Sequence, residues 1–163
     1  MHKKAFLYLD RSVEISIFVI FAVMAIVGGL QVFNRYVLNQ SLSWSEEFQK
    51  FAHIWLIFLT IPVGYNRGSH IGMKLLVGRF PQRIQVNFAL MADFMWLGFA
   101  TATIFYTTVI MGVAKNQTSP GLGVRMDWVY LGLVIGGSYL AIVAVRKIAN
   151  HLSMLISGEF EGE

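Results

Sequence analysis

The chain has 163 residues, of which 56% are hydrophobic and only 13% are charged, and its formal net charge is +4. Soluble domains carry roughly 25% charged residues, so this composition excludes an ordinary soluble enzyme and indicates an integral membrane protein. Cysteine is absent, which excludes disulfides and thiolate metal sites.

The first apolar segment, Ile15–Asn34, contains 20 residues and no formal charge. A helix of this length crosses a hydrocarbon core of about 30 Å at 1.5 Å per residue. We expect a helix over about residues 12–36. It is longer than the apolar region of a signal peptide and no small-x-small cleavage site follows, so we expect it to be retained.

The second helix is expected over about residues 44–66. Ser43 and Glu46 have the spacing of a capping box at its start, and Pro62 is expected to bend its last turn. Because Arg35 ends the first helix while Glu46 and Glu47 begin the second, we expect a structural salt bridge across the outer surface. The alternative is that all three side chains are simply solvated.

The third helix is expected over about residues 82–115, which exceeds the bilayer thickness, so this helix must tilt or project from the membrane. The preceding stretch, His70–Phe80, mixes apolar and basic residues and indicates a short amphipathic helix on the cytoplasmic surface, or else a plain loop. Asp93 is an ionisable group within the third segment. Its role is either coupling of transport or structural pairing near the interface.

The fourth helix is expected over about residues 127–150, followed by an acidic tail at 157–163. No segment shows convincing strand alternation, so a barrel is unfavoured. The predicted fold class is therefore an all-α integral membrane protein, with four tilted transmembrane helices in a single membrane domain spanning residues 1–163.

The basic residues predict the orientation of these helices. Nine of them lie before the first helix, between the second and third, or after the fourth, and four flank the other two connections. The positive-inside rule then places both termini in the cytoplasm. No basic stripe is present, so we do not expect nucleic acid as a partner.

No catalytic motif is present in the sequence. A phosphate-binding glycine loop, a nucleophile elbow and a histidine pair with metal-ligand spacing are all missing, so we expect no catalytic residue, metal site or cofactor in this chain. His53 either titrates or binds a ligand, or it is an interfacial or packed histidine. The spans look continuous, which favours an accessory subunit over a translocation path.

Small residues recur at a spacing of four in three of the predicted helices: Ala25 and Gly29, Gly98 and Ala102, and Gly132 and Gly136. This spacing permits close helix–helix approach in lipid. It serves either docking of a partner or packing within the four-helix bundle, and the sequence leaves both alternatives open.

Two blocks of the chain resemble a known family, the small membrane (Q, DctQ-like) subunit of the tripartite ATP-independent periplasmic (TRAP) transporters. The first block, Gln31–Met73, contains Arg35 and Tyr36, the run WSEE at 44–47, and an R-x-x-H-I-G motif at 67–72. The second, Gln117–Tyr130, contains a serine-proline loop before the last helix. Lys74 departs from the family pattern, in which an acidic residue is expected at that position.

The resemblance implies an accessory subunit in a bacterial inner membrane. Its partners would be a large TRAP membrane subunit that carries the substrate and sodium sites, and a periplasmic binding protein that delivers an organic acid anion. Sialic acid is the favoured substrate, with a C4-dicarboxylate next. Lys115 and Arg125 would help to dock the binding protein. The residues expected at the partner interface are Trp44, Ser45, Ser119, Pro120 and Trp128.

Three alternatives remain open at this point, and one of them is a purely structural membrane protein with no transporter partner. The other two have functions of their own. One is an independent four-helix transporter or channel that acts as a homo-oligomer. The other is a four-helix haem or quinone enzyme, which would need paired histidines at matching depth, and His53 has no such mate in the spans.

Overall fold

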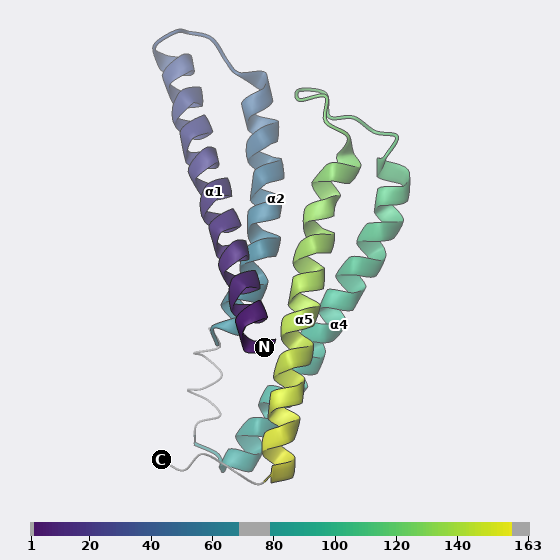
Figure 1. Cartoon of the computed structure of the whole chain (residues 1–163). Helices are drawn as coiled ribbons and strands as arrows, with labels where there is room; N and C mark the ends of the chain where they lie inside the picture. Colours follow the sequence, from purple (N-terminus) through teal and green to yellow (C-terminus); the bar gives the residue numbers. More distant parts are fainter. Residues whose placement is uncertain (1, 69–78, 158–163) are drawn as a thin grey trace.

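The structure, a computed structural model, describes residues 2–68 and 79–157. It contains four long helices there (Figure 1): α1 (His2–Tyr36), α2 (Ser43–Asn66), α4 (Gln82–Ala114) and α5 (Met126–Ser157). Within these two ranges no strand forms, and the β pairing is an isolated bridge between Thr118 and Arg125. The all-α prediction is confirmed. The surface helix predicted for His70–Phe80 and the tail after Ser157 fall almost wholly outside the described residues.

Two helices extend beyond their predicted limits. The structure begins α1 at His2 instead of residue 12, and it continues α5 to Ser157 instead of residue 150. Apolar length predicts only the part of a helix that lipid can surround. The continuations, which mix polar and apolar residues, satisfy their backbone hydrogen bonds within the helix, so they remain helical beyond the uncharged segment.

The start of α2 differs from the predicted capping box. Leu42 is the N-cap, in an extended conformation, and no side chain caps the helix. The hydroxyl of Ser45 donates to the carbonyl oxygen of Leu42 at 2.6 Å, so it does not accept from a free N–H group as a capping side chain would. Pro62 lies inside α2, as expected from the sequence. Gly68, with a φ of 72°, follows the end of α2.

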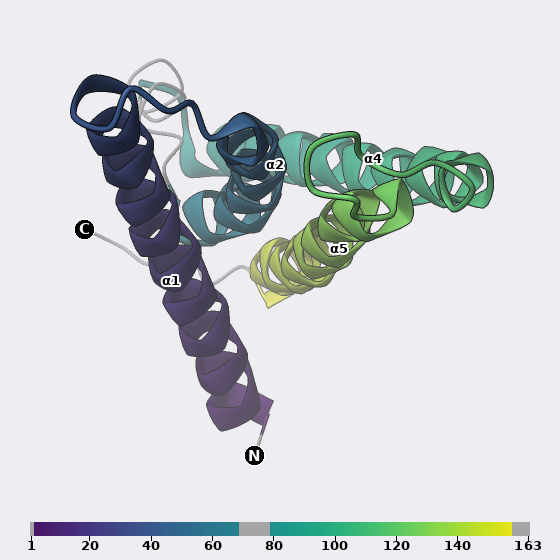
Figure 2. The ribbon, with the colours of Figure 1, turned by 90° about the horizontal axis from the view of Figure 1, so that it is seen from above.

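The four helices form an open row. The helix pairs in contact are α1 with α2, α2 with α5, and α5 with α4. Figure 2 shows α1 and α4 on opposite sides, with α2 and α5 between them. The main buried cluster lies around α5, whose Tyr139, Leu140, Val143 and Ala144 pack with residues of α2 and α4. The row therefore has its core at α5 and leaves α1 at an edge.

Glycine sets the close approach of α2 to α5. A Cβ added to Gly136 would lie 2.4 Å from the backbone oxygen of Phe58, and one added to Gly132 would lie 2.7 Å from the ring of Trp55. This pair thus serves packing within the chain. A Cβ on Gly29 or Gly98 would meet no atom within 4 Å, so these glycines are free of such contacts.

Three helices are long and apolar enough to cross a membrane: α1 from Phe6 to Tyr36, α4, and α5 from Met126 to Ile156. Among the described helices, α2 is not apolar enough over the required length, because its first half carries polar residues that include Gln49, Lys50 and His53. The structure thus supports a multi-pass membrane protein. The crossing of α2 and the cytoplasmic location of both termini stay predictions.

Gly136→Ala is expected to destabilise the protein by about 1–3 kcal/mol, because the added methyl group must push the α2 backbone away. Gly98→Ala is the matched control, since it adds the same group to a helix where no atom obstructs it. Thermal unfolding in detergent, followed by tryptophan fluorescence, measures both. Equal melting temperatures for the two variants would contradict the tight α2–α5 packing.

Candidate functional site: polar clusters at the two ends of the row

Glu47, in the first turns of α2, binds the connection between α4 and α5. One carboxylate oxygen, Oε2, accepts hydrogen bonds from the hydroxyl of Ser119 and from the backbone N–H groups of Gly121, at 2.9 Å, and Leu122, at 3.1 Å. We call these four residues the loop clasp. An ionised carboxylate only accepts hydrogen bonds, so three donors suit it. The clasp ties the α1–α2 hairpin to the α4–α5 hairpin.

The clasped connection is itself an ordered turn. Ser119 N–H donates to Val124 O at 2.9 Å, and Gly123 N–H donates back to Ser119 O at the same distance. Ser119 is only 3% exposed. Position 121 must lack a side chain, because a Cβ added to Gly121 would lie 2.9 Å from Oε2 of Glu47. The carboxylate of Glu47 thus packs directly against the backbone of this turn.

The structure does not bring Arg35 to the two glutamates. The Arg35 guanidinium lies over the ring of Tyr36, 5.9 Å from its centroid, and it forms no ion pair or hydrogen bond with the described residues. Glu46 is exposed. Glu47 finds neutral donors in the α4–α5 connection instead. The predicted pairing across the α1–α2 turn is therefore replaced by the loop clasp.

The other predicted residues near this end divide by exposure. Ser45 is fully buried, and Trp44 makes an edge contact with Phe48 at a centroid distance of 6.5 Å. Trp128, 60% exposed, and Pro120 face outward. Trp128 and, to a smaller extent, Trp44, which is 36% exposed, are the large apolar side chains left for a partner or for lipid.

The two predicted docking cations differ in their contacts. Lys115 is exposed just after α4, and no ion pair or hydrogen bond involves its side chain in the described part of the chain. The guanidinium of Arg125 donates two hydrogen bonds to the carboxylate of Asp127, from Nε to Oδ1 at 3.2 Å and from the terminal nitrogen Nη2 to Oδ2 at 2.5 Å. Lys115 is thus the freer of the two positive charges.

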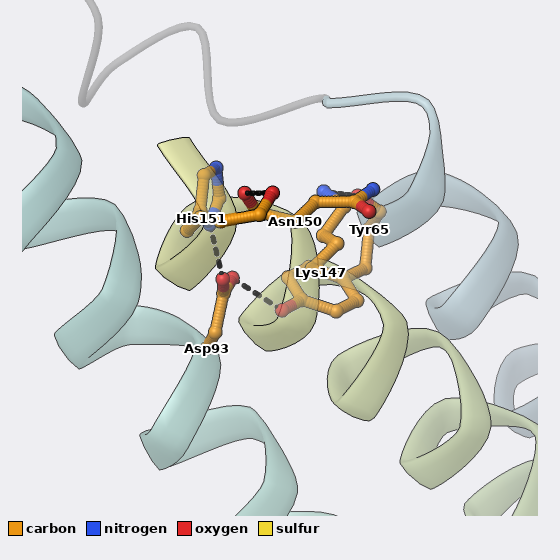
Figure 3. A network of polar contacts seen from close by, with 6 residues as sticks. Tyr65, Asp93, Lys147, Asn150 and His151 are labelled. Atoms are coloured by element: carbon orange, nitrogen blue, oxygen red, sulfur yellow. Dashed lines mark hydrogen bonds and ion pairs between the residues drawn. The ribbon is translucent and has the colours of Figure 1, made fainter. Parts of the chain in front are cut away.

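Asp93 forms the second polar cluster, near the end of the row at which α2 ends. Figure 3 shows its carboxylate between His151 of α5 and Tyr65 of α2. The Tyr65 hydroxyl donates to Oδ1 at 2.5 Å, and His151 Nδ1 lies 2.6 Å from Oδ2. Asp93 is 3% exposed. The structural-pairing alternative for Asp93 matches this geometry, because three helices meet at its side chain.

Asp10 extends this arrangement to α1. Its carboxylate accepts hydrogen bonds from the hydroxyl of Tyr139 at 2.6 Å and from Asn66 Nδ2 at 2.9 Å. The side chain of Asn66 in turn accepts from Arg146. Lys147, one residue later, donates to the backbone oxygen of Tyr65 at 2.5 Å. These contacts fasten α1 and α2 to α5.

The sequence analysis missed the partners of Asp93 and Glu47. His151 lies 58 residues from Asp93, and Ser119 lies 72 residues from Glu47. The available signals were indirect: an unexplained acid inside an apolar segment, and a serine in a turn. The continuation of α5 past residue 150 is what brings His151 to Asp93.

Within the described residues, no group of three or more His, Asp or Glu side chains is arranged to hold a metal ion. Each carboxylate is instead bound to hydroxyl, amide or imidazole groups. The clusters are suited to holding helices and a connecting turn in place.

Comparison with known proteins shows similarity to one family. Residues 24–154 match the tripartite ATP-independent periplasmic transporters, DctQ component. A Haemophilus influenzae protein, named for the small permease role in a TRAP transporter, is 25% identical over 93% of this chain and 94% of its own length. The sialic acid TRAP transporter small permease protein SiaQ of Vibrio cholerae is 21% identical, over 77% of this chain and 73% of that protein.

A third relative has a different size. The isethionate TRAP transporter permease protein DctMQ of Oleidesulfovibrio alaskensis is 26% identical over 67% of this chain, and the match covers 18% of that protein.

Glu47→Ala is expected to lower the melting temperature, because three donors of the α4–α5 connection lose their acceptor. Glu46→Ala removes the same group one position earlier, where it is exposed, and is expected to leave the melting temperature unchanged. Limited proteolysis provides a second readout: cleavage within residues 115–125 should accelerate only in the Glu47 variant. Equal cleavage rates in both variants would count against the clasp.

Asp93→Ala is expected to cost about 1–3 kcal/mol or more, because it leaves the buried hydroxyl of Tyr65 without its acceptor. Asn87→Ala, at an exposed position of α4, is the control. The free energy of unfolding in a mild detergent, measured by denaturant titration, tests this difference. A cost no larger than that of the control would mean that the Asp93 cluster does not hold the helices together.

Proposed function

The chain belongs to the DctQ component family of the tripartite ATP-independent periplasmic transporters, and we propose that it is the small accessory membrane subunit of such a transporter. In this role it stabilises a large permease subunit in the bacterial inner membrane and helps to dock a periplasmic binding protein. Both of its termini would lie in the cytoplasm. The family is one of transporters and not of enzymes.

The observation that carries the proposal is the relation to DctMQ. The name of that permease joins an M and a Q component, and this chain matches 18% of its length. By analogy with that protein, we expect an M-type permease to be the partner of the Q-type sequence of this chain. The whole-length match to the small permease of Haemophilus influenzae supports the same division.

The continuity of the helices favours an accessory role over a role as the transport path. Transport sites near the bilayer midplane use interrupted helices with exposed backbone groups. Here the four helices are continuous, and the buried polar groups Asp93 and Tyr65 bind each other. The proposed substrate, an organic acid anion, would therefore be held by the other two components. Sialic acid is our first candidate and a C4-dicarboxylate the second, with sodium coupling located in the large subunit.

The α4–α5 connection supports the proposed docking role. It lies at the end of the row away from the described start of α1 and end of α5 (Figure 1), and the loop clasp holds it in one conformation. Exposed Lys115 and Arg125 flank it. If both termini are cytoplasmic, this end faces the periplasm and meets the binding protein. Basic side chains there would attract acidic groups of that protein.

Reconstitution in proteoliposomes tests the proposal. We expect sodium-driven uptake of a labelled organic acid when this chain, the large permease subunit and the binding protein are all present. Leaving out this chain should reduce uptake to background, and this chain alone should transport nothing. Uptake by this chain alone would instead establish the independent homo-oligomeric transporter.

The docking role is tested by charge reversal in the same assay. Lys115→Glu combined with Arg125→Glu should slow uptake at limiting binding protein, because rim charges set the association rate. Co-purification with the large subunit should be unchanged. Arg79→Glu, an exposed cation before α4, is the control. Unchanged uptake in the double variant would rule out docking through these two residues.

A further inference from the structure

One face of α2 is exposed along nearly its whole length. Lys50, His53, Ile57 and Thr60 are all exposed and follow each other at intervals of three or four residues, so they lie on one side of the helix. Gly64, half-buried, continues the series. We call these five residues the α2 stripe. No other helix of the row covers it.

The stripe leads into a groove between α2 and α4. The groove has a volume of about 480 Å³ and is lined by six residues of α2, among them Ile57, Thr60 and Gly64, and by Trp96 of α4. It exists because α2 and α4 both pack on α5, while their backbones make no contact with each other. Its lining is almost entirely apolar.

The chemistry of the stripe does not suit lipid. His53 lies six residues after Glu47, whose carboxylate binds the α4–α5 connection, so it lies about 9 Å along the α2 axis from that end of the row. Lys50 interacts electrostatically with the carboxylate of Glu47, one turn away, whereas His53 forms no hydrogen bond or ion pair with another described residue. A polar side chain at that depth without a partner is costly, so such groups face protein or water.

The exposed surface of α1 provides the contrast. Its large exposed side chains within the span are apolar, and they include Ile15, Phe18, Val19, Ile26 and Leu30. This surface can face acyl chains at no cost. The exposed surfaces of α1 and α2 therefore differ: α1 suits lipid, whereas α2 offers donors that lipid cannot satisfy.

The small residues of the stripe allow close contact. The hydroxyl of Thr60 is already bonded to the carbonyl oxygen of Leu56 at 2.7 Å, so it presents mainly its methyl group. Gly64 adds no side chain. Small residues of this kind let a neighbouring helix approach closely in lipid.

We propose that the α2 stripe and the α2–α4 groove are the surface on which a transmembrane helix of the large permease subunit packs, with an acceptor on that helix for His53. The inference rests on the proposed function, which supplies the large subunit as the neighbour. A carboxylate on the partner would also serve Lys50, one turn away. An acyl chain would fill the apolar groove but would leave His53 without an acceptor.

Single cysteines test this placement, and the chain contains no other cysteine. Thr60→Cys and Phe18→Cys are each labelled with a lipid-soluble maleimide, in the presence and absence of the co-expressed large subunit. We expect the large subunit to slow labelling at position 60 by about tenfold or more and to leave position 18 unchanged. The same labelling rate at position 60 in both samples would mean that only lipid fills the groove, and would overturn the inference.

Two further outcomes would also overturn it. One is protection of position 18 but not of position 60. The other is a disulfide-linked dimer of Thr60→Cys that forms equally with and without the large subunit, which would place a second copy of this chain on the stripe.

Variants that keep the cysteine-free background give an independent readout. Thr60→Trp should obstruct the groove and reduce co-purification of the large subunit by about tenfold, while Phe18→Trp should not. His53→Ala should weaken co-purification, and His53→Gln, which keeps a donor, should restore much of it. Full co-purification with both Thr60→Trp and His53→Ala would contradict the proposed surface.

The two proposals fail in distinguishable ways. If the unmodified chain does not co-purify with the large subunit and uptake does not need it, the accessory role itself is refuted. If the unmodified chain does co-purify but position 60 stays accessible, the accessory role stands and the interface lies elsewhere.

Discussion

Hydrogen bonding of carboxylates across helices holds this arrangement together. In a bilayer the exposed surface of a helix loses little by facing lipid, so helices associate through close packing and polar contacts. Glu47 joins α2 to the α4–α5 connection at one end of the row. Asp93 and Asp10 join α4 and α1 to α2 and α5 nearer the other end. Between these points, Gly132 and Gly136 set the distance between α2 and α5.

The helices themselves were predictable because lipid imposes a minimum apolar length on each crossing segment. The limits of α2 and α4 agree with the predicted ones within one residue, whereas α1 and α5 continue into sequence that mixes polar and apolar residues, where the predicted helices ended. The partners of the acids were not predictable. Glu47 and Ser119 come together only through the relative placement of two hairpins, and the local sequence around Glu47 pointed to Arg35 instead.

The small-residue spacings illustrate the same limit. Three pairs have equal spacing in the sequence, yet Gly136 meets the backbone of α2 while Gly29 and Gly98 meet nothing within 4 Å. Spacing predicts that a close approach is possible, and the order of the helices in the row decides whether one occurs. The polar first half of α2 was visible in the sequence, but its exposure became a finding only when α2 was placed beside α5 with no close backbone contact to α4.

An open row has a mechanical consequence for whatever is attached to it. Four helices side by side give an elongated outline in the membrane plane, with α1 and α4 at opposite ends (Figure 2). For the same number of helices, an elongated outline meets more viscous drag against rotation than a round bundle. A protein fixed to one face of this row would therefore rotate more slowly in the membrane plane.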